Sequence, residues 1–155
     1  MDLTFSGLLT TIIIFTIIFA MLGLIFDITL RVLNEQKLYS EFYSEAQRIT
    51  DIVDLLLSQS VWTDRLTASG NSLTLDFFVP SGSSVVKQLK VLRIENSVVT
   101  FDGKKIADIS DVVKAVTFTL EEIQGKKYVM MKIEPVNSKY NTYLVPVMTS
   151  LSEGN

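Results

Sequence analysis

Two hydrophobic patterns divide the chain, and the first is a continuous apolar run. Leu8–Phe26 contains no charged side chain, and only Thr10, Thr11, Thr16 and Gly23 interrupt its large apolar residues. At about 1.5 Å per residue, a helix of this length covers roughly 29 Å, close to the thickness of the hydrocarbon core of a bilayer. The run predicts a transmembrane helix over residues 8–29, preceded by a short N-terminal segment, residues 1–7.

A secretory signal and a buried core helix are the alternatives for this run. The apolar part of a signal is usually about 7–15 residues long, follows positive charge and precedes a small-residue cleavage site. The only charged side chain in residues 1–7 is Asp2, and no convincing pair of small residues follows the run. A transmembrane helix therefore fits the pattern best.

The positive charges near the run give little information on its orientation. The first Lys or Arg of the chain is Arg31, and Lys37 follows it. By the positive-inside rule these two residues favour a cytoplasmic C-terminal domain. Two charges are few for this rule, so the charge pattern leaves the orientation open.

The second pattern is amphipathic and continues the helix. No Gly or Pro lies between Gly23 and Gly70, and after Arg31 apolar residues recur at spacings of three and four. We expect an extension of the same helix over residues 30–60, ending near Ser58, with its apolar face packed on a sheet; a coiled coil is the alternative. The apolar positions are Leu38, Phe42, Ala46, Ile49, Val53, Leu56 and Leu57.

Residues 61–155 alternate apolar and polar positions between turn signals, which predicts an antiparallel sheet of six or seven strands. Asp102-Gly103 is a strong hairpin signal, and Ser110 or Asp111 could cap a short helical turn. The fold class is therefore α+β, a long N-terminal helix packed on a C-terminal antiparallel sheet. The expected strands are Ser72–Pro80, Val85–Ile94, Ser97–Phe101, Lys104–Ala107, Ala115–Glu122, Lys126–Pro135 and Asn141–Met148.

Composition lowers the expectation of an enzyme. The 155 residues include no Cys and no His, which excludes disulfides, thiolate metal sites and the commonest general base. All 14 Lys and Arg, and all but two of the 17 Asp and Glu, lie from Arg31 onward. This near-neutral remainder has no basic footprint for nucleic acid. We expect no catalytic residue, no cofactor, no metal and no small-molecule substrate.

The charged pairs are better explained by surface roles than by chemistry. Asp51 and Asp54 lie three residues apart on the predicted helix, and Asp108 and Asp111 lie three apart near a turn. Such carboxylates could bind Ca²⁺ or act as an acid–base pair. Exposed helix surface and capping are the simpler explanation.

Four aromatic residues near the helix are candidates for a partner surface: Tyr39, Phe42, Tyr43 and Trp62. The first three follow the membrane-proximal turns, so they are either interfacial anchors or a face for neighbouring subunits. Trp62 follows the end of the helix, where packing in or beside the core is the usual role.

This order of elements resembles the type IV pilin family, which includes major and minor pilins and the pseudopilins of type II secretion. The segments "SLTLDFFVPSG" and "LKVLRIENSVVTFDGKKIADISDVVKAVTFTLEEIQGKKYVMMKIEP" are similar to the domain of minor pilins and pseudopilins of the competence and type II secretion kind. In that domain a strand pair and a short hairpin lead to a valine-rich segment and a final strand pair. The resemblance covers nearly the whole chain.

The start of the chain departs from the family pattern. Prepilins carry a basic leader ending in Gly, then an aromatic or apolar residue and, four positions later, a Glu. If Phe5 is the first mature residue, Leu9 stands at the Glu position, and a cut after Gly7 places Ile12 there. In family filaments that Glu neutralises a neighbour's N-terminal amine inside an apolar core. The resemblance therefore implies a filament position that does not need this pairing, such as the tip or the initiation complex.

The resemblance implies a structural subunit of a type IV pilus-like or type II secretion-like filament, active in protein transport or competence. It would lie in the cytoplasmic membrane with its sheet outside the cytoplasm, or in a surface or periplasmic filament. Its partners would be membrane lipid and other pilin-like subunits. The alternative is a single-pass membrane protein whose sheet domain binds a ligand or partner. The residues of helix–helix assembly would be Ser6, Gly7, Leu9, Thr10, Thr11, Ala20 and Gly23. The small or polar ones, all but Leu9, would let helices approach closely.

Overall fold

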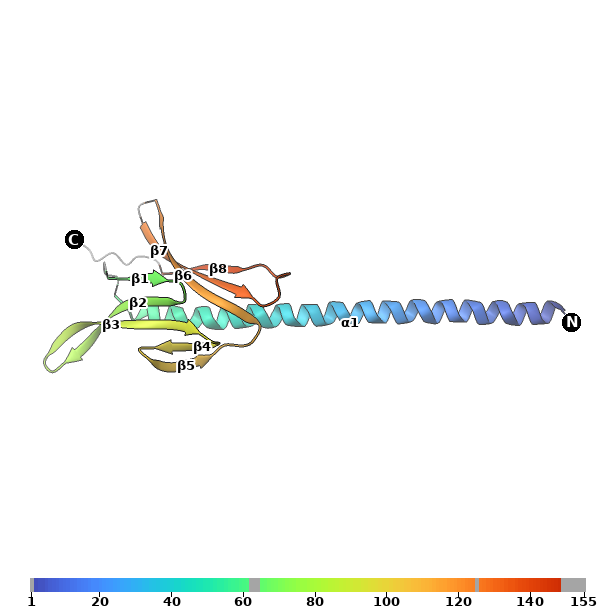
Figure 1. Ribbon diagram of the computed structural model, residues 1–155, viewed down its shortest axis with the longest axis horizontal. Helices are drawn as coiled ribbons and strands as arrows, with labels where there is room; N and C mark the ends of the chain where they lie inside the picture. The colour runs from blue at the N-terminus through green and yellow to red at the C-terminus, as the bar shows by residue number, and fades with distance from the viewer. Residues whose placement is uncertain (1, 62–64, 125, 149–155) are drawn as a thin grey trace. The chain divides into compact units, whose positions relative to one another are not determined.

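The computed structural model describes residues 2–61, 65–124 and 126–148, and these residues form one helix and eight strands (Figure 1). The helix, α1, spans Asp2–Ser58. The chain divides into two compact units, Met1–Tyr39 and Ser40–Asn155. The N-terminal unit therefore holds the apolar part of α1, and the C-terminal unit holds its last turns and the strands.

Helix α1 ends where the sequence predicts. The backbone N–H groups of Gln59 and Ser60 donate to the carbonyls of Leu56 and Leu57, at 3.2 and 3.0 Å. The Ser58 and Ser60 hydroxyls donate to carbonyls three residues earlier, at 2.7 and 2.8 Å. These bonds satisfy carbonyls that the helix itself leaves without a partner, which explains termination at a serine-rich segment.

The strands form two antiparallel sheets. Sheet A has the order β1-β2-β3-β4-β5 and sheet B the order β6-β7-β8, so every pairing is between sequence neighbours. The strands are β1 (Thr67–Ser69), β2 (Ser72–Ser81), β3 (Ser84–Glu95), β4 (Val98–Phe101), β5 (Lys104–Asp108), β6 (Val113–Ile123), β7 (Lys126–Pro135) and β8 (Tyr143–Met148).

Three details differ from the sequence-based expectation. The short strand β1 was not expected, because its three residues are too few for an alternating pattern. The strands form two sheets rather than one, joined by a bridge in which the N–H of Phe118 donates to the carbonyl of Gly70 at 2.6 Å. Near Ser110 the described residues form a turn, closed by Val113 N–H to Ser110 O at 3.2 Å, and no helix.

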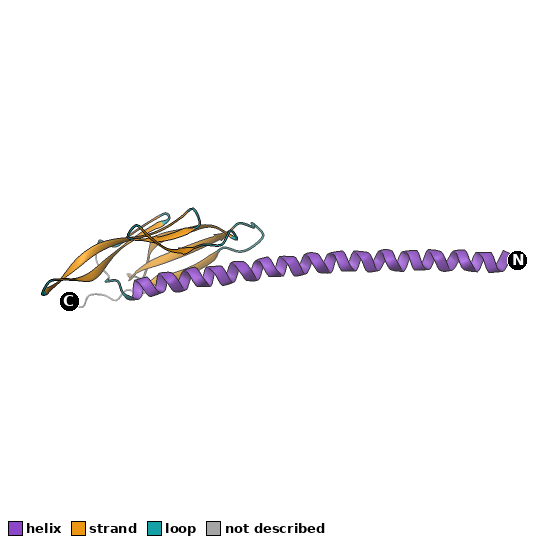
Figure 2. Ribbon diagram, turned by 90° about the horizontal axis from the view of Figure 1, so that it is seen from below, coloured by secondary structure: helices purple, strands orange, loops and turns teal. Residues whose placement is uncertain are grey.

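The C-terminal turns of α1 pack against both sheets, as predicted, and Figure 2 shows the strands on one side of these turns. The buried helix face follows the predicted spacing of three and four residues, and among the described residues Asp76 and Thr50 are the polar ones buried with the core. The core includes Phe42, Ala46, Ile49, Val53 and Leu57 from α1, Leu73, Leu75, Leu92 and Val99 from sheet A, and Val116, Phe118, Val129, Met131 and Ile133 from sheet B.

Candidate membrane and assembly surfaces

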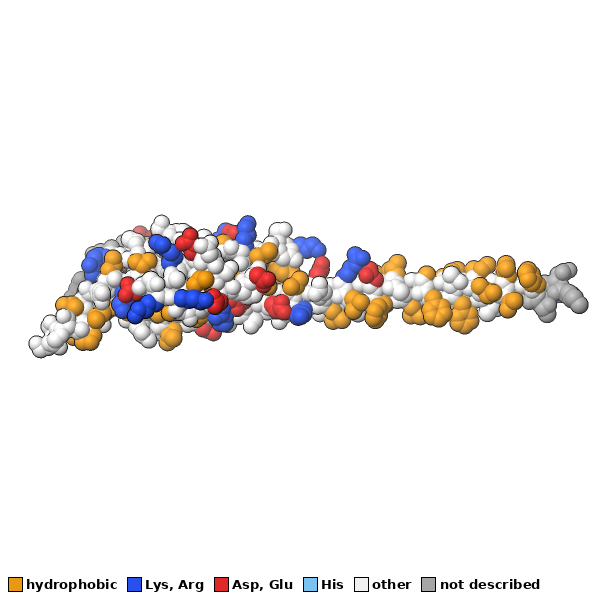
Figure 3. All heavy atoms as spheres, turned by 60° about the horizontal axis from the view of Figure 1, so that its bottom comes forward, with side chains coloured by type: hydrophobic (Ala, Val, Ile, Leu, Met, Phe, Trp, Pro, Cys, Tyr) orange, Lys and Arg blue, Asp and Glu red, His pale blue; other side chains and the backbone are white. Residues whose placement is uncertain are grey.

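The N-terminal unit is an exposed apolar helix. Every large apolar side chain from Phe5 to Leu33 is exposed, by 47% at least. The helix is long and apolar enough to cross a membrane, and its most apolar window buries nothing within the chain. On the face shown in Figure 3, hydrophobic side chains dominate this part of α1, whereas charged side chains spread over the C-terminal unit.

Hydroxyl groups within the apolar run have their donors satisfied inside the helix. The hydroxyls of Thr10, Thr11 and Thr16 donate to carbonyls four residues earlier, each at 2.9 Å. Thr29 makes the same bond to Ile25, at 2.8 Å. A satisfied donor is less costly to place in lipid or between helices than an unsatisfied one, so the threonines are compatible with an apolar environment.

The residues expected to take part in helix–helix assembly fall on two faces of the helix. At 3.6 residues per turn, Ser6, Gly7, Thr10 and Thr11 share one face. Leu9 lies with Ala20 and Gly23 on another, roughly 140° away. A Cβ added at Gly7 or Gly23 would meet no atom within 4 Å. The chain itself therefore leaves these positions open to a neighbour on either face.

The apolar run ends at an ion pair. Arg31 Nη2 lies 2.9 Å from Asp27 Oδ2, one helical turn away, and both side chains are exposed. An exposed pair of this kind stabilises a helix only slightly. Its position marks the change from a charge-free surface to a charged one.

The aromatic candidates have separate roles. Phe42 was expected at a partner surface, but it is fully buried in the core and is unavailable there. Its ring packs edge-on against Tyr43, with centroids 5.6 Å apart, and Tyr43 packs in the same way against Tyr143 of β8 at 5.8 Å. Tyr39 is 43% exposed, and Trp62 lies outside the described residues. Tyr43 therefore packs against β8, and this edge contact between half-buried rings adds to the packing of β8 on α1.

A polar junction holds the loop after β5 on α1. Glu45 accepts hydrogen bonds from Arg48 Nε and Nη2, at 2.9 and 2.6 Å, and from Ser110 N–H at 2.9 Å. Arg48 also donates to the carbonyl of Asp108. The Arg48 hydrogen bonds, with the Ser110 N–H, lower the pKa of Glu45 against the opposing effect of burial, and Glu45 raises the pKa of Arg48.

A second polar junction follows the end of α1. Arg65 binds the Asp76 carboxylate with two hydrogen bonds, 3.0 Å from Nε and 2.5 Å from Nη2. The Asp76 side chain is 0% exposed, whereas that of Arg65 is 56% exposed. The N–H of Val61 also donates to the carbonyl of Asp76, at 2.8 Å. The segment that follows the helix is thereby attached to β2.

The carboxylate pairs from the sequence are not assembled into a site. Asp51 accepts a hydrogen bond from Gln47 at 2.9 Å, and Asp108 pairs with Lys105 at 2.6 Å. Asp111 accepts from the Ser110 hydroxyl at 3.3 Å. Across the described part of the chain, no group of three or more acidic side chains could hold a metal ion.

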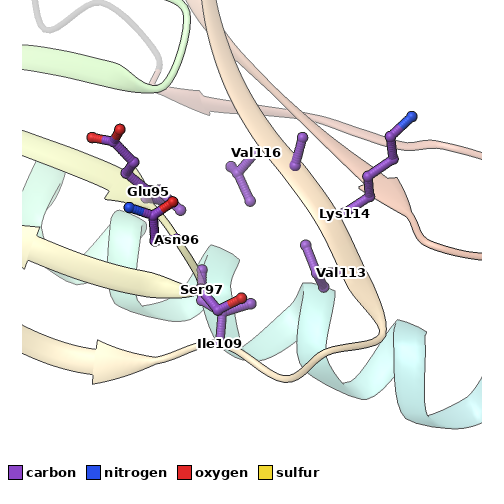
Figure 4. Close-up of a pocket in the computed structure, with 9 residues that line it drawn as sticks. Glu95, Asn96, Ser97, Ile109, Val113, Lys114 and Val116 are labelled. Atoms are coloured by element: carbon purple, nitrogen blue, oxygen red, sulfur yellow. The ribbon is translucent and has the colours of Figure 1, made fainter.

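The pocket in Figure 4 lies between the β3–β4 turn and the start of β6. Its volume is about 50 Å³, whereas pockets for small molecules usually measure about 300–1,000 Å³. Asn96, Ser97, Ile109 and Val113 are among its lining residues, and Lys114 points away from it in the figure. The space suits one or two waters and offers no binding site for an organic ligand.

Sequence reasoning missed an exposed apolar surface on the β2–β3 hairpin. Phe78 and Val85 are 55% and 66% exposed, and Leu89 is also exposed. Consecutive apolar residues, Phe77–Val79 and Val85–Val86, break the alternation of these strands. Two adjacent apolar residues in a strand place one on each face, which was the available signal for a second apolar face.

No family model, curated protein or solved structure significantly matches the chain.

Proposed function

We propose that this protein is a structural subunit of a pilin-like filament, anchored in a membrane as a single-pass protein and assembled through α1. One observation carries the proposal. The same helix that supplies the core of the C-terminal unit begins as an apolar helix whose large side chains are all exposed. A helix of this kind is equally suited to lipid and to the apolar helical core of a filament.

Two further observations support assembly over passive anchoring. Threonine hydroxyls in the apolar run bond within the helix, so neighbouring helices can contact them without leaving a donor unsatisfied. Gly7 and Gly23 lie open on two faces of the helix. Small residues on two faces allow close approach of two neighbours, which a filament needs and an anchor does not.

Replacement of the apolar run tests the proposal. The segment Leu8–Phe26 is exchanged for an unrelated transmembrane helix of the same length, while the C-terminal unit stays intact. We expect membrane insertion to persist and assembly with other subunits to be lost. Assembly is measured by crosslinking at Ser6→Cys, which lies outside the exchanged segment, since the natural chain contains no thiol. Unchanged assembly of the exchanged protein would exclude the proposal.

Gly23→Leu provides a finer test, with Leu24→Met as the matched control. A Cβ added at Gly23 meets no atom within 4 Å, so we expect the fold to be unaffected while helix–helix contacts weaken. Leu9→Glu tests the filament position. If Leu9 places the subunit at the tip, the acidic variant should move into the filament body or lose assembly, and an unchanged position would count against it.

The exposed β2–β3 hairpin favours a second candidate, a single-pass membrane protein whose C-terminal unit binds a partner. The same exchange of Leu8–Phe26 separates the two. A partner-binding protein keeps its function with an unrelated anchor, whereas a filament subunit does not.

A further inference from the structure

The β2–β3 hairpin presents an apolar face that points away from the core. Leu75 and Phe77 of β2 are buried on the core side, so alternate residues of the hairpin lie on the opposite side. The strand register places Phe78 opposite Lys87, and Pro80 opposite Val85, on that side. We call this surface the hairpin face. It consists of Phe78, Pro80, Val85, Lys87, Leu89, Val91 and Arg93.

The hairpin face is basic as well as apolar. It carries the basic residues Lys87 and Arg93, whereas Lys90 lies on the core side, opposite the buried Leu75. The acidic residue on the same side, Asp76 opposite Leu89, is buried and bound by Arg65. The Lys87 ammonium lies 5.8 Å from the centre of the Phe78 ring. A cation beside exposed aromatic and aliphatic side chains suits a partner surface that combines negative charge with apolar area.

The opposite side of the C-terminal unit has that chemistry. Strands cover one side of the last turns of α1 and leave the other bare (Figure 2). On the bare side, Asp51, Asp54 and Leu55 are exposed within one turn, Leu55 by 62%. Partial burial and the neighbouring charge of Asp51 raise the pKa of Asp54. A cation brought to this acidic pair would relieve the repulsion. We call this surface the helix face.

We propose that the hairpin face of one copy binds the helix face of a second copy. The two faces lie on opposite sides of the helix-on-sheet unit, so they cannot meet within one chain. A contact between two unlike surfaces leaves the helix face of one copy and the hairpin face of the other available, so it can repeat along a filament. This inference rests on the proposed function and adds a head-to-tail contact between C-terminal units to the contacts between helices.

An anionic lipid surface is the other occupant that a basic, apolar hairpin suits. The chemistry of the helix face favours a second copy, because Asp51, Asp54 and Leu55 combine acidic charge with exposed apolar area.

Crosslinking of the full-length protein in bilayer vesicles tests the contact. Two preparations with different tags, one carrying Leu89→Cys on the hairpin face and one carrying Leu55→Cys on the helix face, are mixed and treated with a short thiol crosslinker. Leu144→Cys, exposed on β8, replaces Leu89→Cys in the matched control. We expect mixed dimers of Leu89→Cys with Leu55→Cys, at a yield well above the control.

Charge reversal makes the test specific. Lys87→Glu with Arg93→Glu, or Asp51→Lys with Asp54→Lys, should each reduce the mixed dimer about tenfold, as expected for several exposed charge pairs turned to repulsion. All four changes together, with reversed charges facing each other, should restore it. A yield no higher than the Leu144→Cys control, or no restoration by the fourfold variant, would overturn the proposal. The proposal would also be overturned if a photocrosslinker at position 85 gave mainly a lipid adduct.

Helix crosslinking at Ser6→Cys separates this inference from the proposed function. If the helix crosslink forms and the face-to-face one does not, the head-to-tail contact is wrong and the filament proposal survives. If the face-to-face crosslink forms without the helix crosslink, the head-to-tail contact between C-terminal units is supported, and assembly through α1 is wrong.

Discussion

Ser110 and Glu45 are 65 residues apart in sequence, yet the Ser110 N–H donates a 2.9 Å hydrogen bond to Glu45 Oε1. The same carboxylate accepts two hydrogen bonds from Arg48, which also donates to the carbonyl of Asp108. The Glu45 carboxylate thus links the loop between β5 and β6 to α1 through hydrogen bonds. The loop leads directly into β6, so this junction positions the first strand of sheet B on the helix.

Glu45→Gln should destabilise the C-terminal unit by about 1 kcal/mol at neutral pH, since it weakens charge-assisted bonds in a partly exposed site. The pKa of Glu45 is lowered from its ordinary value of 4.5. Its stabilisation is therefore complete above that value and is lost as the pH falls through the folded-state pKa. Urea unfolding of the full chain in mild detergent, followed by near-ultraviolet circular dichroism, measures the difference.

The difference between the natural protein and Glu45→Gln should shrink as the pH falls below 4.5, the ordinary value from which the pKa of Glu45 is lowered. Glu95→Gln, exposed at the end of β3, is the matched control and should change stability little. A Glu45→Gln effect that stays constant with pH would show that the charge of Glu45 does not stabilise the fold.

Arg65→Met should be among the most destabilising changes outside the apolar core, because it leaves the buried Asp76 carboxylate without its guanidinium partner. We expect a loss of about 2–3 kcal/mol, below the range for fully buried pairs since Arg65 is half exposed. Adding Asp76→Asn removes the buried charge that has lost its guanidinium, so the double variant should be more stable than Arg65→Met alone. Additive effects of the two changes in urea unfolding would contradict a coupled pair.

Ser97→Gly should stabilise the protein by about 0.5–1 kcal/mol. Asn96 and Ser97 form the two-residue turn between β3 and β4, with φ of 51° and 59°. The turn that joins β4 to β5 has the same kind of conformation at Asp102 and Gly103, with φ of 52° and 76°. Gly adopts this left-handed region without steric strain, whereas Ser does not. Gly103→Ser is the reciprocal variant, and thermal unfolding should show it destabilised.

The local elements were predictable because their signals are short-range. The spacing of Phe42, Ala46, Ile49 and Val53 was sufficient to identify the buried face of α1, and these side chains are fully buried. Asp102-Gly103 was sufficient to predict the β4–β5 turn. The contact between the two sheets was not predictable, since the bridge that joins them pairs Gly70 with Phe118, 48 residues apart, and no local pattern encodes it.

The candidate surfaces were less predictable than the fold. Phe42 lies on the apolar face that the spacing predicts to pack on a sheet, and its full burial there excludes the alternative role at a partner surface. The hairpin face was missed because its residues have the composition of a buried strand. In the structure β2 and β3 extend past the core, and this extension leaves Phe78 and Val85 exposed.

Ile17→Lys should prevent stable membrane insertion, because residue 17 is the midpoint of the uncharged run and its side chain is 50% exposed. A lysine at the centre of a transmembrane helix costs about 2.5–3.5 kcal/mol. Leu55→Lys, a change of similar size at an exposed position in the C-terminal unit, is the matched control and should leave insertion unchanged. The measurement is the fraction of protein that remains in membranes after alkaline carbonate extraction. If both variants resist extraction as the natural protein does, residues 8–29 do not cross the bilayer. If both are extracted, the C-terminal unit contributes to membrane attachment.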